Sequence, residues 1–363
     1  MSIKLRFALM AMVFAAIAGC AKEKDLTERE IQEKILDAYI QTNCPSAQKL
    51  SSGLTILSLT QGSGPIAPGD NDGIYIHYNT YQLDGTCQST TDSVKARMLG
   101  TYDPAVYYGP TLFILNSSIT KGMKELLGKL HQGGKATAII PPWLTSAGAN
   151  SSSYTHAGQQ STLNMIYEVK AGIVIDDVDK FQKDSLESYS RLYFSPKVDS
   201  TAMGWYFRNF THPDGIPAAD TIEAGKTIGV WYVGRLLDGY VFDTNIRDTA
   251  KKYRIYDASN DYTALSVEMG KTYQDMTTYG SSATSNDNTT GSEGKQSLIL
   301  GFVRAIKNMT YADRGVTFFM SGLGYGSEGS MKSGKGVPEY AMLRFDVWVA
   351  YSTDTKFPPT RTK

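Results

Sequence analysis

An internal duplication constrains the fold of this chain more than any other feature of its sequence. Each copy opens with alternating apolar and polar residues, turns on Gly and Pro, and returns in a second alternating run. Alternation with a period of two, bounded by such turns, predicts β-strands. We therefore expect the chain to fold one β-rich unit twice. The matching landmarks of the two copies are Tyr78 and Tyr232, Asp84-Gly85 and Asp238-Gly239, Gly122 and Gly301, and the closing runs 163–167 and 343–347.

Helix-like segments accompany each copy. Residues 26–42 and 176–193 place apolar side chains at helical spacing in otherwise charged sequence, which predicts two amphipathic helices. Because a helix that only spaces two domains needs no apolar stripe, we expect both to dock on a domain or on each other. A shorter helix-like run follows each landmark glycine. The apolar positions of the long segments are Ile31, Ile35, Leu36, Tyr39 and Ile40, and then Val178, Phe181, Leu186, Tyr189 and Leu192.

The length of 363 residues suits two compact domains. Two stretches rich in Ser, Thr, Gly and Ala or Asn, 145–160 and 277–294, are predicted to be mobile surface loops. The predicted organisation is a signal peptide at 1–19, a tether at 20–25, an N-terminal helix at 26–45, a first domain at 46–174, a linker helix at 175–195 and a second domain at 196–353.

The N-terminus indicates export. Lys4 and Arg6 precede an apolar run at 7–18, which is too short to span a bilayer of ~30 Å and fits a secretory signal. The sequence Ile17-Ala18-Gly19-Cys20 resembles a lipobox, after which the Cys receives lipid. We therefore expect Cys20 to anchor the mature chain in the envelope of a Gram-negative bacterium, on an outer membrane and facing the periplasm or the surface. An ordinary signal peptide that contains a Cys stays open as the alternative.

Charge, cysteine and histidine content exclude several classes. Lys plus Arg and Asp plus Glu are both 36, so the chain lacks the basic excess that nucleic-acid binding needs. Once Cys20 carries lipid, Cys44 and Cys87 remain, and in an oxidising compartment they either pair or stay free. Metal ligation is not predicted, and a hydrolase or metalloenzyme is poorly supported. The histidines without ligand spacing are His77, His131, His156 and His212.

The second copy carries four motifs in order between residues 204 and 351. They are the run 230–244, which contains Tyr232-Val233-Gly234 and Phe242-Asp243, then Ile299-Leu300-Gly301-Phe302, then Leu323-Gly324-Tyr325-Gly326, and finally Val337-Pro338 with the strand 343–347. In this order they resemble the FKBP-type peptidyl-prolyl cis-trans isomerases. The resemblance implies an α+β fold of two tandem FKBP-like domains, each a curved antiparallel sheet around a short helix and each preceded by an amphipathic helix.

The resemblance also implies a site without metal or cofactor. Asp243 would orient the substrate, and the Tyr325 hydroxyl and the Ile299 backbone N–H would donate hydrogen bonds to substrate carbonyls. Phe302 would form the pocket floor, where the family usually has Trp, and Leu265 stands where an aromatic is usual. An insertion of about two dozen residues separates the strand at 265–271 from Ile299. The implied substrate-binding residues are Tyr232, Phe242, Leu265, Phe302 and Phe345.

The first copy departs further from the family pattern. Gln88-Ser89 align with the Phe-Asp pair, Met123 with the pocket floor, Ser146 with the neighbourhood of the flap Tyr, and Met165 with the closing Phe. Because both polar groups and most aromatics are replaced, we expect this copy to keep the fold and lose the chemistry.

Two functions follow from the resemblance. The first is a prolyl isomerase that assists the folding of exported proteins, acts on proline-containing peptides and carries its catalysis in the second domain. The alternative is a non-catalytic lipoprotein whose two domains bind a peptide or protein partner.

Overall fold

The computed structural model describes residues 26–64, 68–116, 119–145, 163–194, 199–201, 203–211, 222–279, 295–330, 336–351 and 356–357. The predicted signal peptide, Cys20 and the tether lie outside these ranges, as do Ser146, His156 and His212. Within the described ranges, no helix has the length and apolar character needed to cross a membrane.

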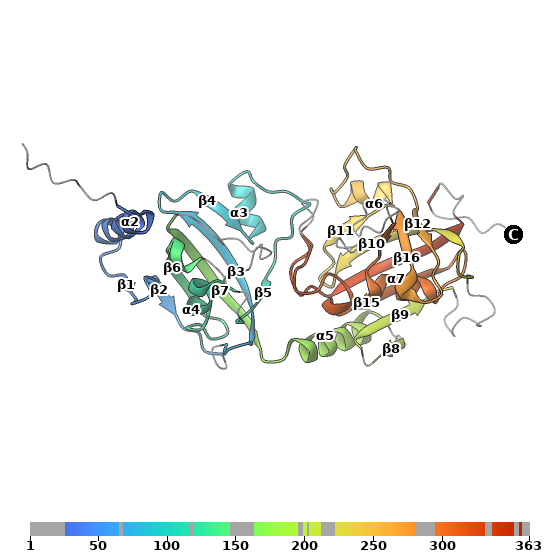
Figure 1. The fold of residues 1–363 in the computed structure, drawn as a ribbon, viewed down its shortest axis with the longest axis horizontal. Helices are drawn as coiled ribbons and strands as arrows, with labels where there is room; N and C mark the ends of the chain where they lie inside the picture. The colour runs from blue at the N-terminus through green and yellow to red at the C-terminus, as the bar shows by residue number, and fades with distance from the viewer. Residues whose placement is uncertain are drawn as a thin grey trace, which may run out of the picture.

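The first domain is a seven-stranded antiparallel sheet with helices around it (Figure 1). Its strand order is β1-β2-β6-β7-β3-β4, and β5 also pairs with β3. The elements are α2 (Glu28–Asn43), β1 (Gln48–Lys49), β2 (Thr55–Thr60), β3 (Gly73–Gln82), β4 (Cys87–Thr90), α3 (Ser93–Met98), β5 (Thr111–Ile114), α4 (Lys121–Leu127), β6 (Lys135–Ile140), η1 (Pro142–Leu144) and β7 (Met165–Ile175).

The second domain is a nine-stranded antiparallel sheet, and it follows directly after the helix α5. Its strand order is β14-β13-β12-β10-β16-β15-β9-β8, and β11 also pairs with β10. The elements are α5 (Val178–Tyr193), β8 (Asp199–Thr201), β9 (Trp205–Asn209), β10 (Thr227–Leu236), β11 (Val241–Thr244), α6 (Arg247–Lys252), β12 (Leu265–Glu268), η3 (Tyr273–Asp275), β13 (Thr277–Tyr279), β14 (Lys295–Ser297), α7 (Leu300–Lys307), β15 (Arg314–Phe319), η4 (Ser321–Leu323) and β16 (Leu343–Tyr351).

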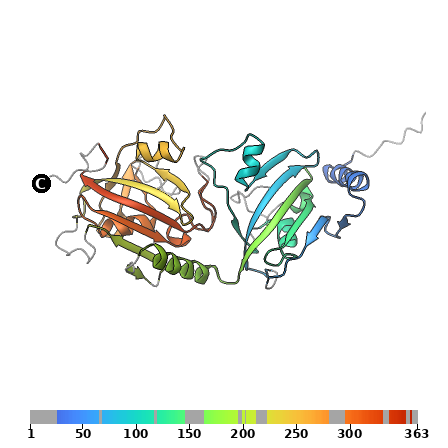
Figure 2. The same cartoon turned by 180° about the vertical axis from the view of Figure 1, so that it is seen from behind.

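The two sheets share one topology. The path β2-β6-β7-β3 of the first domain corresponds to β9-β15-β16-β10 of the second, and two short strands leave β3 and β10 in the same way. Seen from behind, each sheet curves around its short helix, α4 or α7 (Figure 2). The predicted fold class, two α+β domains of this kind each preceded by an amphipathic helix, is confirmed.

The short helix of each domain packs closely on its sheet because a glycine begins its apolar face. A Cβ at Gly122 would collide with Ile140, and one at Gly301 would collide with the ring of Phe319. This contact lets α4 bury Leu126 and Leu127 and lets α7 bury Phe302 and Ile306. Each such side chain contributes about 1.5–3 kcal/mol of burial free energy.

The long helices α2 and α5 dock on their own domains by the same device, a buried Gln four residues before a buried Leu. In α2, Gln32 bonds Asn164 through its side chain and its carbonyl, and Leu36 is fully buried. In α5, the Gln182 Nε2 donates to the Ser321 Oγ at 3.0 Å and its Oε1 accepts from the Ser321 N–H at 2.8 Å. Leu186 is fully buried beside it. Both helices therefore belong to the domain that follows them.

The predicted loop at 277–294 is wrong at its start, because Thr277–Tyr279 form the strand β13. This strand pairs with β12 on one side and with β14 on the other. The β-branched and aromatic residues of β13 favour an extended backbone, which explains the addition to the sheet. The rest of the insertion, 280–294, lies outside the described residues, as do 146–160 of the other predicted loop.

Candidate functional site

The site predicted for the second domain is built on β10, which lies between β11 and β16. Gly234 of β10 pairs with Asp243 of β11 on one side and with Phe345 of β16 on the other. A register shift at Gly234/Arg235 bends the strand next to this pairing. Tyr232 lies two residues earlier, so its side chain leaves the sheet on the same face as that position. The sheet thus brings three predicted site residues together from distant parts of the chain.

Four aromatic rings form the centre of the site. The ring centroids of Phe302 and Phe345 are 5.0 Å apart, and Tyr232 lies 5.7 Å from Phe302 at a near-perpendicular angle of 74°. Phe242 meets Phe345 edge to face at 5.7 Å. Edge-to-face and tilted pairs place the positive ring edge against a negative face, which adds about 0.5–1.5 kcal/mol per pair to the burial.

Gly234 makes this cluster possible. A Cβ at that position would lie 2.7 Å from Cζ of Phe242 and 3.0 Å from Cε1 of Phe345. Only the bare glycine backbone leaves room for both rings against the strand. Gly234 belongs to the Tyr-x-Gly motif, but its packing role was not predicted from the sequence.

Asp243 is a buried carboxylate with a defined partner. It is 6% exposed, and its Oδ2 accepts a hydrogen bond of 2.7 Å from the Tyr232 hydroxyl. The chain just after it is held to β10, since the Asn245 Oδ1 accepts from the Tyr232 N–H at 2.9 Å and the Thr244 hydroxyl donates to the Tyr232 carbonyl at 2.6 Å. Burying a carboxyl group is costly unless hydrogen bonds compensate it, and the Tyr232 hydroxyl supplies such a bond.

The helix α7 and the segment after η4 complete the site. Ile299 is the N-cap residue of α7 and is fully buried, and Phe302 lies in the first turn of the helix. Tyr325 is half-buried and meets Phe242 edge to face, with ring centroids 6.4 Å apart. Leu265 of β12 is also half-buried and packs against the same core.

The structure therefore places all eight predicted residues of this domain in one neighbourhood. Phe242, Phe302, Phe345 and Ile299 are at most 1% exposed, and of the eight residues only Leu265 and Tyr325 are partly exposed. Phe319, Trp205 and Tyr240 also pack on this core and were not predicted. Of these three, only Trp205 could have been predicted, because a Trp at the start of a repeat is a candidate for core packing. In the structure its indole N–H donates a hydrogen bond of 3.0 Å to the Gly301 carbonyl.

The equivalent position in the first domain carries different residues. Thr80 of β3 pairs with Ser89 of β4, so Thr80 occupies the place of Gly234 and Ser89 that of Asp243. Gln88, in the place of Phe242, is exposed. Thr91 accepts a hydrogen bond from the Tyr78 N–H at 2.9 Å, as Asn245 does from Tyr232, so the strand geometry is retained. Met123 and Met165 are both buried in the core.

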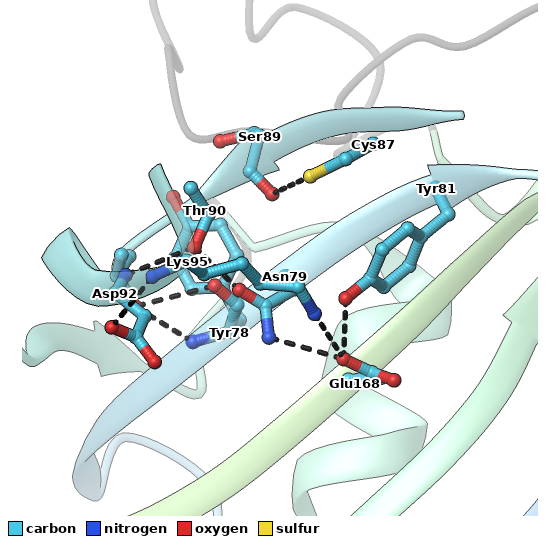
Figure 3. Close-up of polar contacts among 10 residues, drawn as sticks. Tyr78, Asn79, Tyr81, Cys87, Ser89, Thr90, Asp92, Lys95 and Glu168 are labelled. Carbon is cyan, nitrogen blue, oxygen red and sulfur yellow. Dashed lines mark hydrogen bonds and ion pairs between the residues drawn. The ribbon is translucent and has the colours of Figure 1, made fainter. Parts of the chain in front are cut away.

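A polar network lies on the face of the first domain's sheet that is opposite to Tyr78 and Thr80 (Figure 3). Glu168 accepts hydrogen bonds from the Tyr81 hydroxyl at 2.6 Å, the Asn79 amide at 3.1 Å and the Lys95 ammonium at 3.2 Å. It borders a groove of about 510 Å³ that also contains His77, Lys135 and Lys170. No group of His, Cys, Asp and Glu within the described ranges could hold a metal ion.

Both remaining cysteines are free thiols, so the structure does not contain the disulfide that the sequence left open. Cys44 is the C-cap residue of α2, whereas Cys87 begins β4 in a separate part of the domain. The Cys87 thiol donates to the Ser89 carbonyl, and burial raises the pKa of this thiol.

Comparisons with known proteins give structural matches only. No protein-family model and no curated protein matches the chain. FkpA from Escherichia coli matches 48% of this chain and 74% of its own, with 20% identity and a TM-score of 0.29. Wheat FKBP73, with three FKBP domains, matches 84% of this chain and 98% of its own at 14% identity and a TM-score of 0.27. A peptidyl-prolyl isomerase from Pseudomonas syringae matches 42% and 99% at 19% identity and a TM-score of 0.30.

Proposed function

We propose that the second domain is a peptidyl-prolyl cis-trans isomerase and that the first domain is its non-catalytic companion. The observation that carries this proposal is the Tyr232–Asp243 hydrogen bond beside the cluster of Phe242, Phe302 and Phe345. Aromatic packing alone would serve a core. A buried carboxylate at the end of a strand serves no packing purpose, which points to a functional role.

The reaction suits a site of this composition. Rotation about an X-Pro bond breaks amide resonance, with a barrier of ~18–20 kcal/mol. The twisted amide has less charge separation than the planar one, so it loses less solvation free energy on entering an apolar site. Groups that bind the twisted state more strongly than the planar state accelerate the rotation without a covalent step.

We assign each residue of the proposed site a part in binding the peptide. Phe302 would form the floor beneath the proline ring, with Tyr232, Phe242 and Phe345 as walls and Ile299 at the helix start. The Asp243 carboxylate would orient the peptide, and the Tyr325 hydroxyl would donate to a peptide carbonyl. Because the four rings are almost fully buried, a proline would reach them only after a rearrangement of the partly exposed side chains Leu265 and Tyr325.

The N-terminal sequence extends the proposal to location and clients. An export signal followed by lipid on Cys20 would hold both domains at an envelope membrane. There they would meet newly exported chains, whose X-Pro bonds isomerise slowly without catalysis.

The near-complete burial of the rings favours a second candidate, a non-catalytic module that binds proline-containing peptides at the edge formed by Leu265 and Tyr325. A proline-peptide isomerisation assay on the chain separates the two functions. Catalysis that falls in Asp243→Ala and Tyr325→Phe supports the isomerase, whereas peptide binding without any rate above background supports the binding module.

A further inference from the structure

One segment of the first domain leaves its own sheet and contacts the second domain. Residues 99–110, between α3 and β5, extend toward the neighbouring domain in both views (Figures 1 and 2). Three tyrosines, Tyr102, Tyr107 and Tyr108, lie on this segment. We call it the tyrosine loop.

The tyrosine loop meets the second domain at Tyr240. The Tyr240 hydroxyl donates a hydrogen bond of 2.6 Å to the carbonyl of Ala105. The Tyr107 ring meets the Tyr240 ring edge to face, with centroids 5.3 Å apart at 62°. The Tyr107 hydroxyl also forms a hydrogen bond with Asp238. Burial, and then the Asp238 carboxylate, raise the pKa of the Tyr107 hydroxyl. Backbone, ring and hydroxyl contacts therefore fix Tyr107 against the turn that leads into β11.

This contact lies next to the proposed binding site. Tyr240 stands two residues before Phe242, and alternate residues of an extended chain point to the same face. Tyr107 and Tyr240 both pack against the apolar cluster that contains Phe242, Phe302 and Phe345. Tyr325 and Leu323 pack on the same cluster from the segment around η4. The first domain thus places an aromatic ring at the border of a site that otherwise belongs to the second.

The tyrosine loop is organised to present that ring. Tyr108 stacks on Tyr102 with centroids 5.3 Å apart, and the Arg97 guanidinium lies 4.0 Å from the centroid of the Tyr102 ring. The Asp103 carboxylate accepts from the Ala105 N–H at 2.8 Å. A Cβ at Gly109 would overlap the Tyr107 hydroxyl, so the loop closes tightly over its own side chain. A ring held in this way is a preorganised contact for a ligand.

We propose that the binding site is composite: Tyr107 of the first domain forms one wall of it and selects the residues that flank the substrate proline. The proposal rests on the isomerase function assigned above to the second domain. Paired Tyr107 and Tyr240 rings would favour a peptide with an aromatic residue beside the proline over one with alanine there. The domain that has lost its own chemistry would then set the specificity of the other.

The test compares peptides that carry Phe or Ala on either side of the proline. Isomerisation and fluorescence-anisotropy binding are measured for the full chain and for Tyr107→Ala, Tyr107→Phe and Tyr240→Phe. Val106→Ala, an exposed neighbour in the same loop, is the matched control. Tyr107→Ala should lower the Phe-over-Ala preference in kcat/KM by about 2- to 10-fold, since aromatic pairs contribute at this scale. Tyr107→Phe should retain the preference, and Tyr240→Phe, which loses the bond to Ala105, should reduce it partly.

The outcomes distinguish a failure of the composite-site proposal from a failure of the proposed isomerase function. If the chain isomerises both peptides, depends on Asp243 and keeps the same preference in Tyr107→Ala, the composite site is refuted while the isomerase stands. If the wild-type chain neither binds nor isomerises any peptide, the proposed function falls and the composite site falls with it. An equal change in Val106→Ala would also overturn the proposal, because it would show a general effect of the loop.

Discussion

The substitution Gly234→Ala tests the packing of the site most sharply. It adds one methyl group to a buried strand position whose backbone needs no special conformation, so its whole effect is steric. The new Cβ would lie 2.7 Å from Cζ and 2.9 Å from Cε2 of Phe242, closer than side-chain carbons approach in real proteins. The ring cannot swing out freely, because Phe242 is 1% exposed and rests on Phe345 and Tyr325.

Overpacking of this kind costs about 1–3 kcal/mol. For a domain of this size the melting temperature should fall by about 2–12 °C, at roughly 2–4 °C per kcal/mol. Calorimetry on the chain measures this fall in the transition of the second domain. Displacement of Phe242 should also lower isomerase activity in molecules that are still folded.

Gly322→Ala is the matched control, because a Cβ there meets nothing within 4 Å and the residue is exposed. It should change stability by no more than about 0.5 kcal/mol. If Gly234→Ala melts and catalyses like the wild type, then the rings do not depend on that glycine and the description of the site is wrong.

Two further predictions concern the attachment of α5 and the N-terminus. Gln182→Ala leaves the Ser321 N–H without its side-chain partner in a buried position, so the second domain should lose about 1–3 kcal/mol in denaturant unfolding, and an unchanged midpoint would show that α5 does not hold this segment. Cys20→Ser should release the exported chain from the membrane fraction of expressing cells, and continued sedimentation with membranes would refute the lipid anchor.

Much of the fold followed from the sequence because the repeat signals are local. The spacing of Gly and apolar residues around Tyr78 and Tyr232 depends on strand and turn chemistry, and the structure places these strands in equivalent positions. The amphipathic stripes predicted α2 and α5 in the same way. Each of these patterns is set within a few turns or strands, where neighbours in sequence are neighbours in space.

The parts that could not be predicted depend on contacts between distant segments. Nothing near Tyr107 in the sequence indicates that it packs beside Tyr240 of the other domain. The sequences of the two copies show that Thr80 stands where the second copy has Gly234. They do not show why a glycine is needed there, because the reason is the position of the Phe242 ring against the strand. The strand β13 was missed because its three strand-favouring residues stand at the start of a long run of small polar residues, and its pairing with β12 cannot be read from the sequence.

The most direct test of the central claim is the rate of X-Pro isomerisation in Asp243→Asn and Asp243→Ala. Both variants are compared with wild type and with Asp248→Asn, an exposed carboxylate on α6. Hydrogen bonds to charged groups contribute about 1.5–3 kcal/mol, so Asp243→Ala should lower kcat/KM by about 10- to 100-fold while Asp248→Asn leaves it unchanged. A wild-type chain that does not accelerate isomerisation, or an Asp243→Ala variant that is folded and fully active, would contradict the account.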